Sequence, residues 1–360
     1  MKDARLEKRL KRLWKCAAPD TDCFFITSPE NVVYLCGFSG TEGSLLLTRK
    51  DGFFLTDGRY TTQAKEQVKN FPSITFKEKW KEIGRLLKKL RVRTVGFESR
   101  NLSVSLLREL EREAYSAAFR PYGDELDMLR AVKDAREAAL LKRAARIAAE
   151  SLEEVFVTIR PGMREIEIAA ELEYRMRAKG GSSVAFQTIV ASGYRSALPH
   201  GPASTKKIKK GELITIDYGV VCEGYCSDET CTFVMGKPTK KQERIYEIVK
   251  GAHDAAMAQV APGRALKDID GAARSHIEQK GCARFFTHGT GHGVGLAVHE
   301  PPVVSSRSQG RAEKGMVFTI EPGVYLPRWG GVRIEDTVIV TNSGYDCVTR
   351  FNKELTVIEI

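Results

Sequence analysis

The stretch KGELITIDYG, residues 210–219, returns as KGMVFTIEPG at residues 314–323. In each copy Lys-Gly is followed by three mostly apolar residues, Thr-Ile, an acid, one further residue and Gly. This pattern indicates a turn that leads into a buried strand ending in a carboxylate. Burying an ionised carboxylate is costly unless it is paired or binds a metal. The repeated acid, Asp217 in one copy and Glu321 in the other, therefore predicts one site formed by two related halves.

The sequence before each copy repeats in the same frame. A Pro-Gly pair at 161–162 precedes an expected helix that ends at 179–180, and a second pair at 262–263 precedes another that ends at 280–281. Such residues are ordinary helix boundary signals, but their identical spacing, 101 residues apart, indicates a duplication. We therefore expect two α/β halves related by a pseudo-twofold axis, with antiparallel sheet inside and helices outside.

Residues 1–122 predict a separate, smaller α/β domain, because expected strands alternate with expected helices through this region. Two apolar runs separated by a Lys-Asp-Gly turn, residues 44–48 and 52–56, predict a β-hairpin. Residues 31–43, NVVYLCGFSGTEG, predict a strand that runs into a glycine-rich loop.

The polar segment RPYGDELD, residues 120–127, contains Pro and Gly and predicts the domain boundary. We place a linker at residues 123–130 and the duplicated domain at residues 131–360. A long helix rich in Ala, Leu, Lys and Arg is expected over residues 128–157. The expected fold class is α+β, with a smaller α/β domain preceding the duplicated domain.

Composition indicates a cytoplasmic protein without a membrane or nucleic-acid partner. No apolar run approaches the roughly 18 residues that span a bilayer, and the charged start MKDARLEKRLKRLWK contains no apolar signal-peptide core. Eight cysteines without a regular spacing predict reduced thiols. The net charge of +11 comes from scattered basic residues, which favours a solvated surface.

The duplication supplies a second acid in each half, two residues before a Thr that starts an apolar strand. The four acids are Asp217, Asp228, Glu321 and Glu335. Four converging carboxylates would raise one another's pKa and destabilise the fold unless cations intervened. Two divalent ions would balance them, and such pairs are a common basis for hydrolysis. Oxygen ligands favour Mn(II), and an added imidazole nitrogen extends the choice to Co, Zn or Fe.

A glycine-rich segment, THGTGHGVGLAVHE at 287–300, supplies nitrogen donors. It contains three of the chain's six histidines, namely His288, His292 and His299. This density indicates a site, because imidazole is both a metal ligand and a proton carrier. His200 lies in the proline-flanked SALPHGP loop and could overhang the site, whereas His253 and His276 fall on expected helices and are interpreted as structural.

The motifs ITIDYG, SDETCTF, HGTGHGVGLAVHE, FTIEPGVY and GVRIEDTV, spread over most of residues 155–360, resemble the pita-bread metallopeptidases. That group includes methionine aminopeptidase, proline dipeptidase (prolidase) and Xaa-Pro aminopeptidase. The N-terminal YLCGFSGTEG and TDGRYTTQA are similar to the creatinase-type domain of prolidases and Xaa-Pro aminopeptidases, which methionine aminopeptidases lack. The resemblance therefore covers nearly the whole chain.

The resemblance implies a five-residue metal shell. Its members are Asp217, Asp228, His292, Glu321 and Glu335. Asp217 would chelate one metal, Asp228 and Glu335 would bridge both, and His292 and Glu321 would complete the ligand set of the second metal. One departure is Cys231, which stands between two threonines where many relatives have Arg; the thiols Cys222, Cys226 and Cys231 are interpreted as small buried residues on strands.

The resemblance also implies residues around a substrate. His200 and His299 would contact it and stabilise an oxyanion, and Glu321 would accept the proton of water and pass it to the leaving nitrogen. The expected lining of the proline pocket is His288, Tyr325 and Arg333.

The expected activity is that of a dinuclear-metal Xaa-Pro aminopeptidase, which hydrolyses the N-terminal Xaa-Pro bond of proline-containing peptides. The GFSG and TDGRY motifs favour it over the alternative, an Xaa-Pro dipeptidase. A non-catalytic relative that binds protein or nucleic acid would usually have lost metal ligands, and creatinase-like chemistry without metal would leave the five matching ligands unexplained. The resemblance further implies a homodimer.

Overall fold

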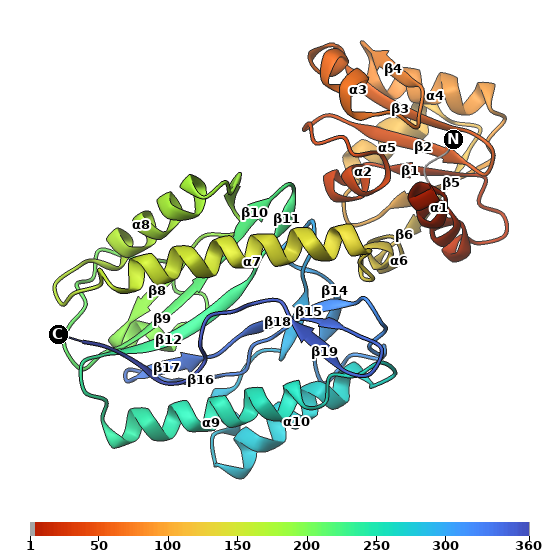
Figure 1. Cartoon of the computed structure of the whole chain (residues 1–360). Helices are drawn as coiled ribbons and strands as arrows, with labels where there is room; N and C mark the ends of the chain where they lie inside the picture. Colours follow the sequence, from red (N-terminus) through yellow and green to blue (C-terminus); the bar gives the residue numbers. More distant parts are fainter. Residues whose placement is uncertain (1–3, 360) are drawn as a thin grey trace. The chain divides into compact units, whose positions relative to one another are not determined.

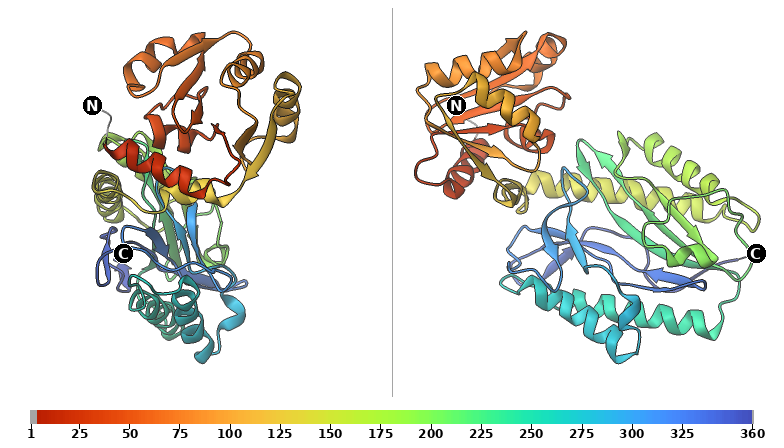
Figure 2. Two further views of the ribbon diagram at one scale, coloured as in Figure 1. Left: turned by 90° about the vertical axis from the view of Figure 1, so that its right-hand side faces the viewer. Right: turned by 180° about the vertical axis from the view of Figure 1, so that it is seen from behind.

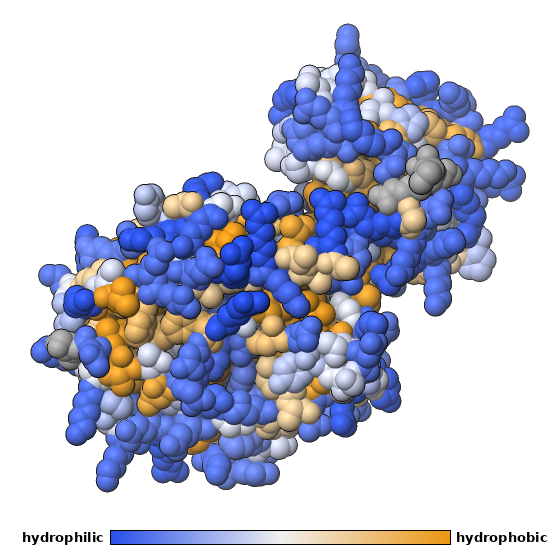
Figure 3. Space-filling model, in the orientation of Figure 1, coloured by the Kyte–Doolittle hydropathy of each residue, from blue (hydrophilic) through white to orange (hydrophobic). Residues whose placement is uncertain are grey.

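The computed structural model describes residues 4–359 (Figures 1 and 2). The chain divides after Arg130 into two compact units. Over residues 4–359, no helix combines the length and the apolar character needed to cross a membrane. On the face seen in Figure 3, hydrophilic side chains predominate and apolar ones gather in small patches.

The first unit is built on a six-stranded sheet with the order β4-β3-β2-β1-β5-β6. Its strands are β1 (Cys23–Ile26), β2 (Ser44–Thr48), β3 (Gly52–Asp57), β4 (Ser73–Phe76), β5 (Thr94–Glu98) and β6 (Ala118–Tyr122). Its helices are α1 (Ala4–Cys16), α2 (Pro29–Cys36), α3 (Thr61–Gln67), α4 (Lys79–Lys89), α5 (Val104–Glu113) and α6 (Asp124–Asp127), with 3-10 turns η1 (Gly58–Tyr60) and η2 (Met128–Arg130). The predicted β2–β3 hairpin is confirmed, with Leu45 opposite Phe54.

The predicted strand after residue 31 is wrong, because residues 29–36 form the helix α2. Ser28 caps its first turn by accepting a hydrogen bond from Asn31 N at 3.2 Å, and Pro29 occupies the first turn. Gly37 ends the helix in the left-handed region, at φ 80°. These capping signals outweigh the strand preference of the β-branched and aromatic residues between them.

Residues 123–130, where the sequence predicts a linker, form α6 and η2 and group with the first unit. The long helix α7 begins later than expected and spans Ala135–Phe156. Its start is determined by a capping box, in which Asp134 accepts hydrogen bonds from Arg136 N and Glu137 N while Glu137 accepts one from Asp134 N.

Replacing Asp134 with alanine is expected to lower the free energy of unfolding by about 1 kcal/mol, because two backbone N–H groups of α7 lose their acceptor. Thermal unfolding should show a fall in Tm of about 2–4 °C. Asp134→Ser keeps a capping oxygen and should recover most of the loss. An alanine variant with wild-type Tm would contradict this role for the cap.

The described residues of the second unit form four sheets, of which the smaller two have the strand orders β11-β10-β7 and β16-β17. The larger two are built mainly from the strands of one half of the duplication each. Their strand orders are β20-β12-β9-β8 and β14-β13-β15-β18-β19. The first half comprises α7, α8 (Glu165–Ala178), β7 (Ser183–Val184), β8 (Ile189–Ser192), η3 (Gly193–Ala197), β9 (Leu213–Tyr218), β10 (Val220–Cys222), β11 (Tyr225–Cys226) and β12 (Glu229–Met235). The second comprises α9 (Lys240–Met257), α10 (Leu266–Gln279), η4 (Ala283–Phe285), β13 (Gly291–Gly293), β14 (Glu300–Val304), β15 (Val317–Ile320), β16 (Gly323–Leu326), β17 (Gly330–Arg333), β18 (Asp336–Val340), β19 (Tyr345–Cys347) and β20 (Thr356–Ile358).

The duplication is visible in matched hydrogen bonds. Gly162 N donates to Ile208 O at 2.8 Å, and Gly263 N donates to Ala312 O at 2.8 Å. The antiparallel pair β9–β12 in one half corresponds to β15–β18 in the other. In Figures 1 and 2, α7 and α8 lie outside one sheet and α9 and α10 outside the other. The predicted arrangement of antiparallel strands inside and helices outside is confirmed.

Each pair of helices buries one face of its sheet. In β9, Ile216 packs into the core formed with α7 and α8. Because successive side chains of a strand alternate between faces, its neighbours Thr215 and Asp217 face the other way. The acids of the two halves are thus presented on the faces that their own helices do not cover.

Candidate metal and substrate site

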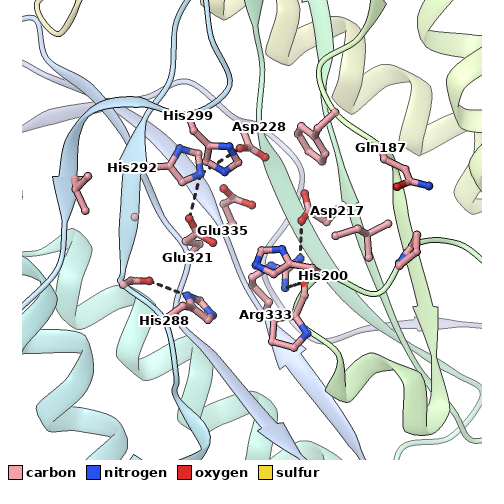
Figure 4. Close-up of a pocket in the computed structure, with 17 residues that line it drawn as sticks. Gln187, His200, Asp217, Asp228, His288, His292, His299, Glu321, Arg333 and Glu335 are labelled. Carbon is pink, nitrogen blue, oxygen red and sulfur yellow. Dashed lines mark hydrogen bonds and ion pairs between the residues drawn. The ribbon is translucent and has the colours of Figure 1, made fainter. Parts of the chain in front are cut away.

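The four acids occupy matched strand ends. Asp217 lies near the end of β9 and Glu321 directly follows β15, whereas Asp228 and Glu335 directly precede β12 and β18. Antiparallel pairing brings the end of one strand beside the start of its partner, as the pairing of Thr230 with Asp217 shows. All four carboxylates consequently line one cavity of about 410 Å³ (Figure 4).

His292, on β13, completes the group. Its Nε2 lies 3.3 Å from Glu321 Oε1 and 3.6 Å from Asp228 Oδ2. One ligand atom each of Asp228, His292 and Glu335 falls within 4.8 Å of the others. The residues that the sequence predicts as metal ligands therefore converge from both halves of the duplication.

The carboxylates of this group repel one another, and bound cations would offset that repulsion. Burial raises the pKa of Asp228 well above its ordinary range, and Glu335, Asp217 and Glu321 raise it further. Burial likewise raises the pKa of Glu335, with added repulsion from Glu321 and Asp217. Arg333 supplies one compensating charge, donating from Nη2 to Asp217 Oδ2 at 2.5 Å. Like charges buried this closely are stable only when protonated or when neutralised by bound cations.

Two further observations fit a metal. Asp217 Oδ1 is buried and has no hydrogen-bond partner within residues 4–359, which is unusual for a buried carboxylate oxygen. Burial lowers the pKa of His292, which favours the neutral imidazole that binds metals. Carboxylate oxygens with one imidazole nitrogen suit Mn(II), Co, Zn or Fe(II), so the donor set is that of a divalent metal site.

Threonines hold the acids in place, and sequence reasoning missed this role. Thr319 donates to Glu321 Oε1 at 3.0 Å, and Thr230 donates to Glu335 Oε2 at 2.6 Å across the two halves. Thr337 donates in the reverse direction, to the backbone oxygen of Asp228 at 2.9 Å. The sequence contains a signal for this role, because Thr230 and Thr337 each follow an acid by two residues. Such outer contacts orient metal ligands.

The other predicted site residues surround the same cavity. His200 and His299 line it, and the rings of His299 and His292 are 4.1 Å apart. His288 also lines it, with Nε2 2.9 Å from the hydroxyl of Tyr325. Tyr325, predicted as part of the pocket lining, contacts His288 but is not one of the residues that line the cavity.

Arg333 connects these groups. It donates from Nη1 to Tyr325 Oη and to Pro199 O, both at 3.0 Å, beside His200. The loop that carries His200 is thereby tied to the strand β17, which ends just before the acid Glu335.

Part of the cavity wall has no counterpart in the predicted site. These residues are Phe186, Gln187, Ile189 and Val303, whereas Pro199 and Pro202, which also line the cavity, lie in the predicted His200 loop. Only the folding of the segments around β8 and β14 brings the first four residues to the site. Cys222, Cys226 and Cys231 are free and buried, as their interpretation as small buried residues predicts.

Comparison with known families supports the same assignment. Residues 139–342 match the family described as Metallopeptidase family M24. The chain belongs to metallopeptidase family M24. Residues 8–132 match the Creatinase/Prolidase N-terminal domain, so both the predicted pita-bread fold and its creatinase-type N-terminal domain are confirmed.

Several M24 relatives resemble the chain over nearly its full length. An Xaa-Pro dipeptidase of Pyrococcus furiosus is 38% identical over 351 residues, which are 97% of this chain and 100% of that protein. The structure of an Xaa-Pro dipeptidase from Bacillus anthracis superposes with a TM-score of 0.95 at 38% identity, covering 98% of this chain and 99% of the other. The structure of an X-Pro aminopeptidase from Thermotoga maritima superposes with a TM-score of 0.88 at 36% identity, covering 94% of this chain and 98% of the other.

Proposed function

We propose that this chain is a metal-dependent Xaa-Pro dipeptidase, which hydrolyses dipeptides with proline in the second position. The observation that carries the proposal is the convergence of two buried carboxylates, two partly buried ones and His292 on one cavity. The sequence motifs favoured an aminopeptidase. The Pyrococcus and Bacillus relatives, both named Xaa-Pro dipeptidases, support the dipeptidase instead.

Five residues would hold two divalent ions, of which Mn(II) suits the oxygen-rich donor set. They are Asp217, Asp228, His292, Glu321 and Glu335. When bound, such ions supply an acidified water and polarise the scissile carbonyl. Enzymes of this family depend on a metal pair of this kind.

The chain's own residues would handle the proton and the developing charge. Burial raises the pKa of Glu321, and Thr319 fixes one of its oxygens, so its carboxylate is oriented to accept a proton and return it to the leaving nitrogen. Burial lowers the pKa of His299, which, with His200, lines the cavity as a hydrogen-bond donor for an oxyanion. His288, Tyr325 and Arg333 form a bonded group that would position proline.

The second candidate is an Xaa-Pro aminopeptidase, which accepts longer peptides. The similarity to the Thermotoga maritima X-Pro aminopeptidase favours it, because that structure also superposes over nearly the whole chain. Both candidates use the same metal chemistry and differ in what the site tolerates beyond proline.

A comparison of kcat/KM on an Xaa-Pro dipeptide and on the matching Xaa-Pro-Yaa tripeptide separates the candidates. We expect the dipeptide to be favoured by more than about 100-fold, because a site that binds the terminal carboxylate of proline rejects a peptide bond there. Comparable values would favour the aminopeptidase. Hydrolysis of neither peptide by metal-loaded protein would contradict both.

A further inference from the structure

A second pair of acids lies directly behind two of the proposed metal ligands. Glu229 follows Asp228 at the start of β12, and Asp336 follows Glu335 at the start of β18. Because neighbouring side chains of a strand face opposite sides, these acids point away from the cavity. Their side chains are nonetheless buried, with exposed fractions of 1% for Glu229 and 9% for Asp336.

One lysine reaches both acids. Lys353 comes from the segment between β19 and β20, and its side chain is 8% exposed. Its Nζ pairs with Glu229 Oε1 and lies 3.5 Å from Asp336 Oδ1. The same Nζ is 3.4 Å from Cys231 Sγ, on the same face of β12 as Glu229. A single ammonium group therefore connects the two halves of the duplication.

The remaining hydrogen bonds fix the two acids firmly. Glu229 accepts from Phe351 N and from the Tyr218 hydroxyl, both at 3.0 Å. Asp336 accepts from the Thr349 hydroxyl, and His253 Nε2 lies 3.1 Å from its Oδ2. Movement of Lys353 would therefore be transmitted to β12 and β18 through rigid contacts.

We propose that Lys353 is a positioning residue of the metal centre, which sets the spacing of Asp228 and Glu335 by holding Glu229 and Asp336 together. On the cavity side, β12 and β18 are already joined through Glu335 N and Thr230 O at 3.2 Å. Lys353 clamps them on the opposite side, and this inference rests on the proposed metal centre. Without the ammonium, two buried like charges would repel each other and draw the ligands apart.

The test replaces Lys353 with methionine, which keeps a long side chain and removes the charge. Mn²⁺ is titrated into metal-free protein well below its unfolding temperature, and dipeptide hydrolysis is measured at saturating Mn²⁺. We expect Mn²⁺ affinity to fall by about 10–100-fold, as for other residues that support metal ligands. At saturating Mn²⁺, kcat should fall while KM changes little, because Lys353 does not line the cavity.

Two matched variants separate positioning from general stability. Lys353→Arg keeps a cation and should hold Mn²⁺ affinity closer to the wild-type value than Lys353→Met does. Lys206→Met breaks a part-buried ion pair with Glu212, 2.6 Å long, elsewhere in the same unit. Lys206→Met should leave Mn²⁺ affinity unchanged even if the Tm of this variant falls.

Distinct outcomes would overturn this inference or the proposed function. Wild-type protein that binds no divalent metal would overturn the metal centre itself. A Lys353→Met variant with wild-type Mn²⁺ affinity and kcat, but a lower metal-free Tm, would show that Lys353 is only structural. If Lys353→Met does not fold, the double variant Lys353→Met, Glu229→Gln removes the repulsion between Glu229 and Asp336 but still lacks the lysine that holds them together. This double variant should therefore bind Mn²⁺ more weakly than wild type, and equal affinity would overturn the inference.

Discussion

Replacing Asp228 with alanine is expected to lower kcat/KM on an Xaa-Pro dipeptide by far more than about 100-fold. Even residues that only support metal ligands lower metal affinity or activity by about 10–100-fold when they are replaced. The same change should not destabilise the metal-free protein. Asp228 is buried against three other acids that raise its pKa, so its removal relieves repulsion. The variant should lose activity and metal-induced stabilisation while keeping or raising its metal-free Tm.

Activity assays and thermal unfolding with and without Mn²⁺ check this prediction. The matched control is Asp346→Ala, which removes an exposed acid of β19 whose partner Lys142 is 3.5 Å away. A surface pair of this kind is worth about 0–1 kcal/mol, so activity and Mn²⁺ response should both persist. An Asp228→Ala variant that keeps substantial activity would argue against a ligand role for this acid.

The largest expected effect on stability is that of divalent metal, and it should depend on pH. The folded-state pKa values of Asp228 and Glu335 are raised above those of the unfolded chain. The folded, metal-free protein therefore binds these protons more tightly, and its free energy of unfolding should fall as the pH rises from about 4. Metals bind the deprotonated carboxylates, so metal-induced stabilisation should grow over the same range.

Thermal unfolding from about pH 5 to about pH 8 measures both effects. At a Mn²⁺ concentration about 1,000 times its Kd, the stabilisation should be about 4 kcal/mol, or about 10 °C in Tm. Near pH 5 the difference between metal-loaded and metal-free protein should be smaller. A metal-free Tm that rises with pH, together with no response to metal, would contradict the buried acid cluster.

The central acids could be predicted from the sequence because the duplication places them twice. Asp217 and Glu321 lie at the ends of matched strands, and Asp228 and Glu335 directly precede the partner strands, so antiparallel pairing brings the two acids of each half together. A polar residue at a repeated position in an apolar strand is a strong local signal. The helices after each Pro-Gly pair were predictable for the same reason.

Other features depend on contacts between segments far apart in the sequence. Phe186 and Val303 reach the cavity through the folding of separate loops, which no local pattern indicates. Lys353 is one of many lysines in the sequence, and only its burial beside Glu229 and Asp336 distinguishes it. The strand predicted after residue 31 was wrong because the cap formed by Ser28 outweighed the preferences of the residues within α2.

The most direct test of the metal centre measures metal content and hydrolysis together. Protein is stripped by exhaustive chelation and then titrated with Mn²⁺, while bound metal per chain and hydrolysis of an Xaa-Pro dipeptide are followed. We expect the stripped protein to be inactive, to bind two ions per chain and to recover activity as they bind. Full dipeptide hydrolysis by the stripped protein, with no metal bound, would contradict it.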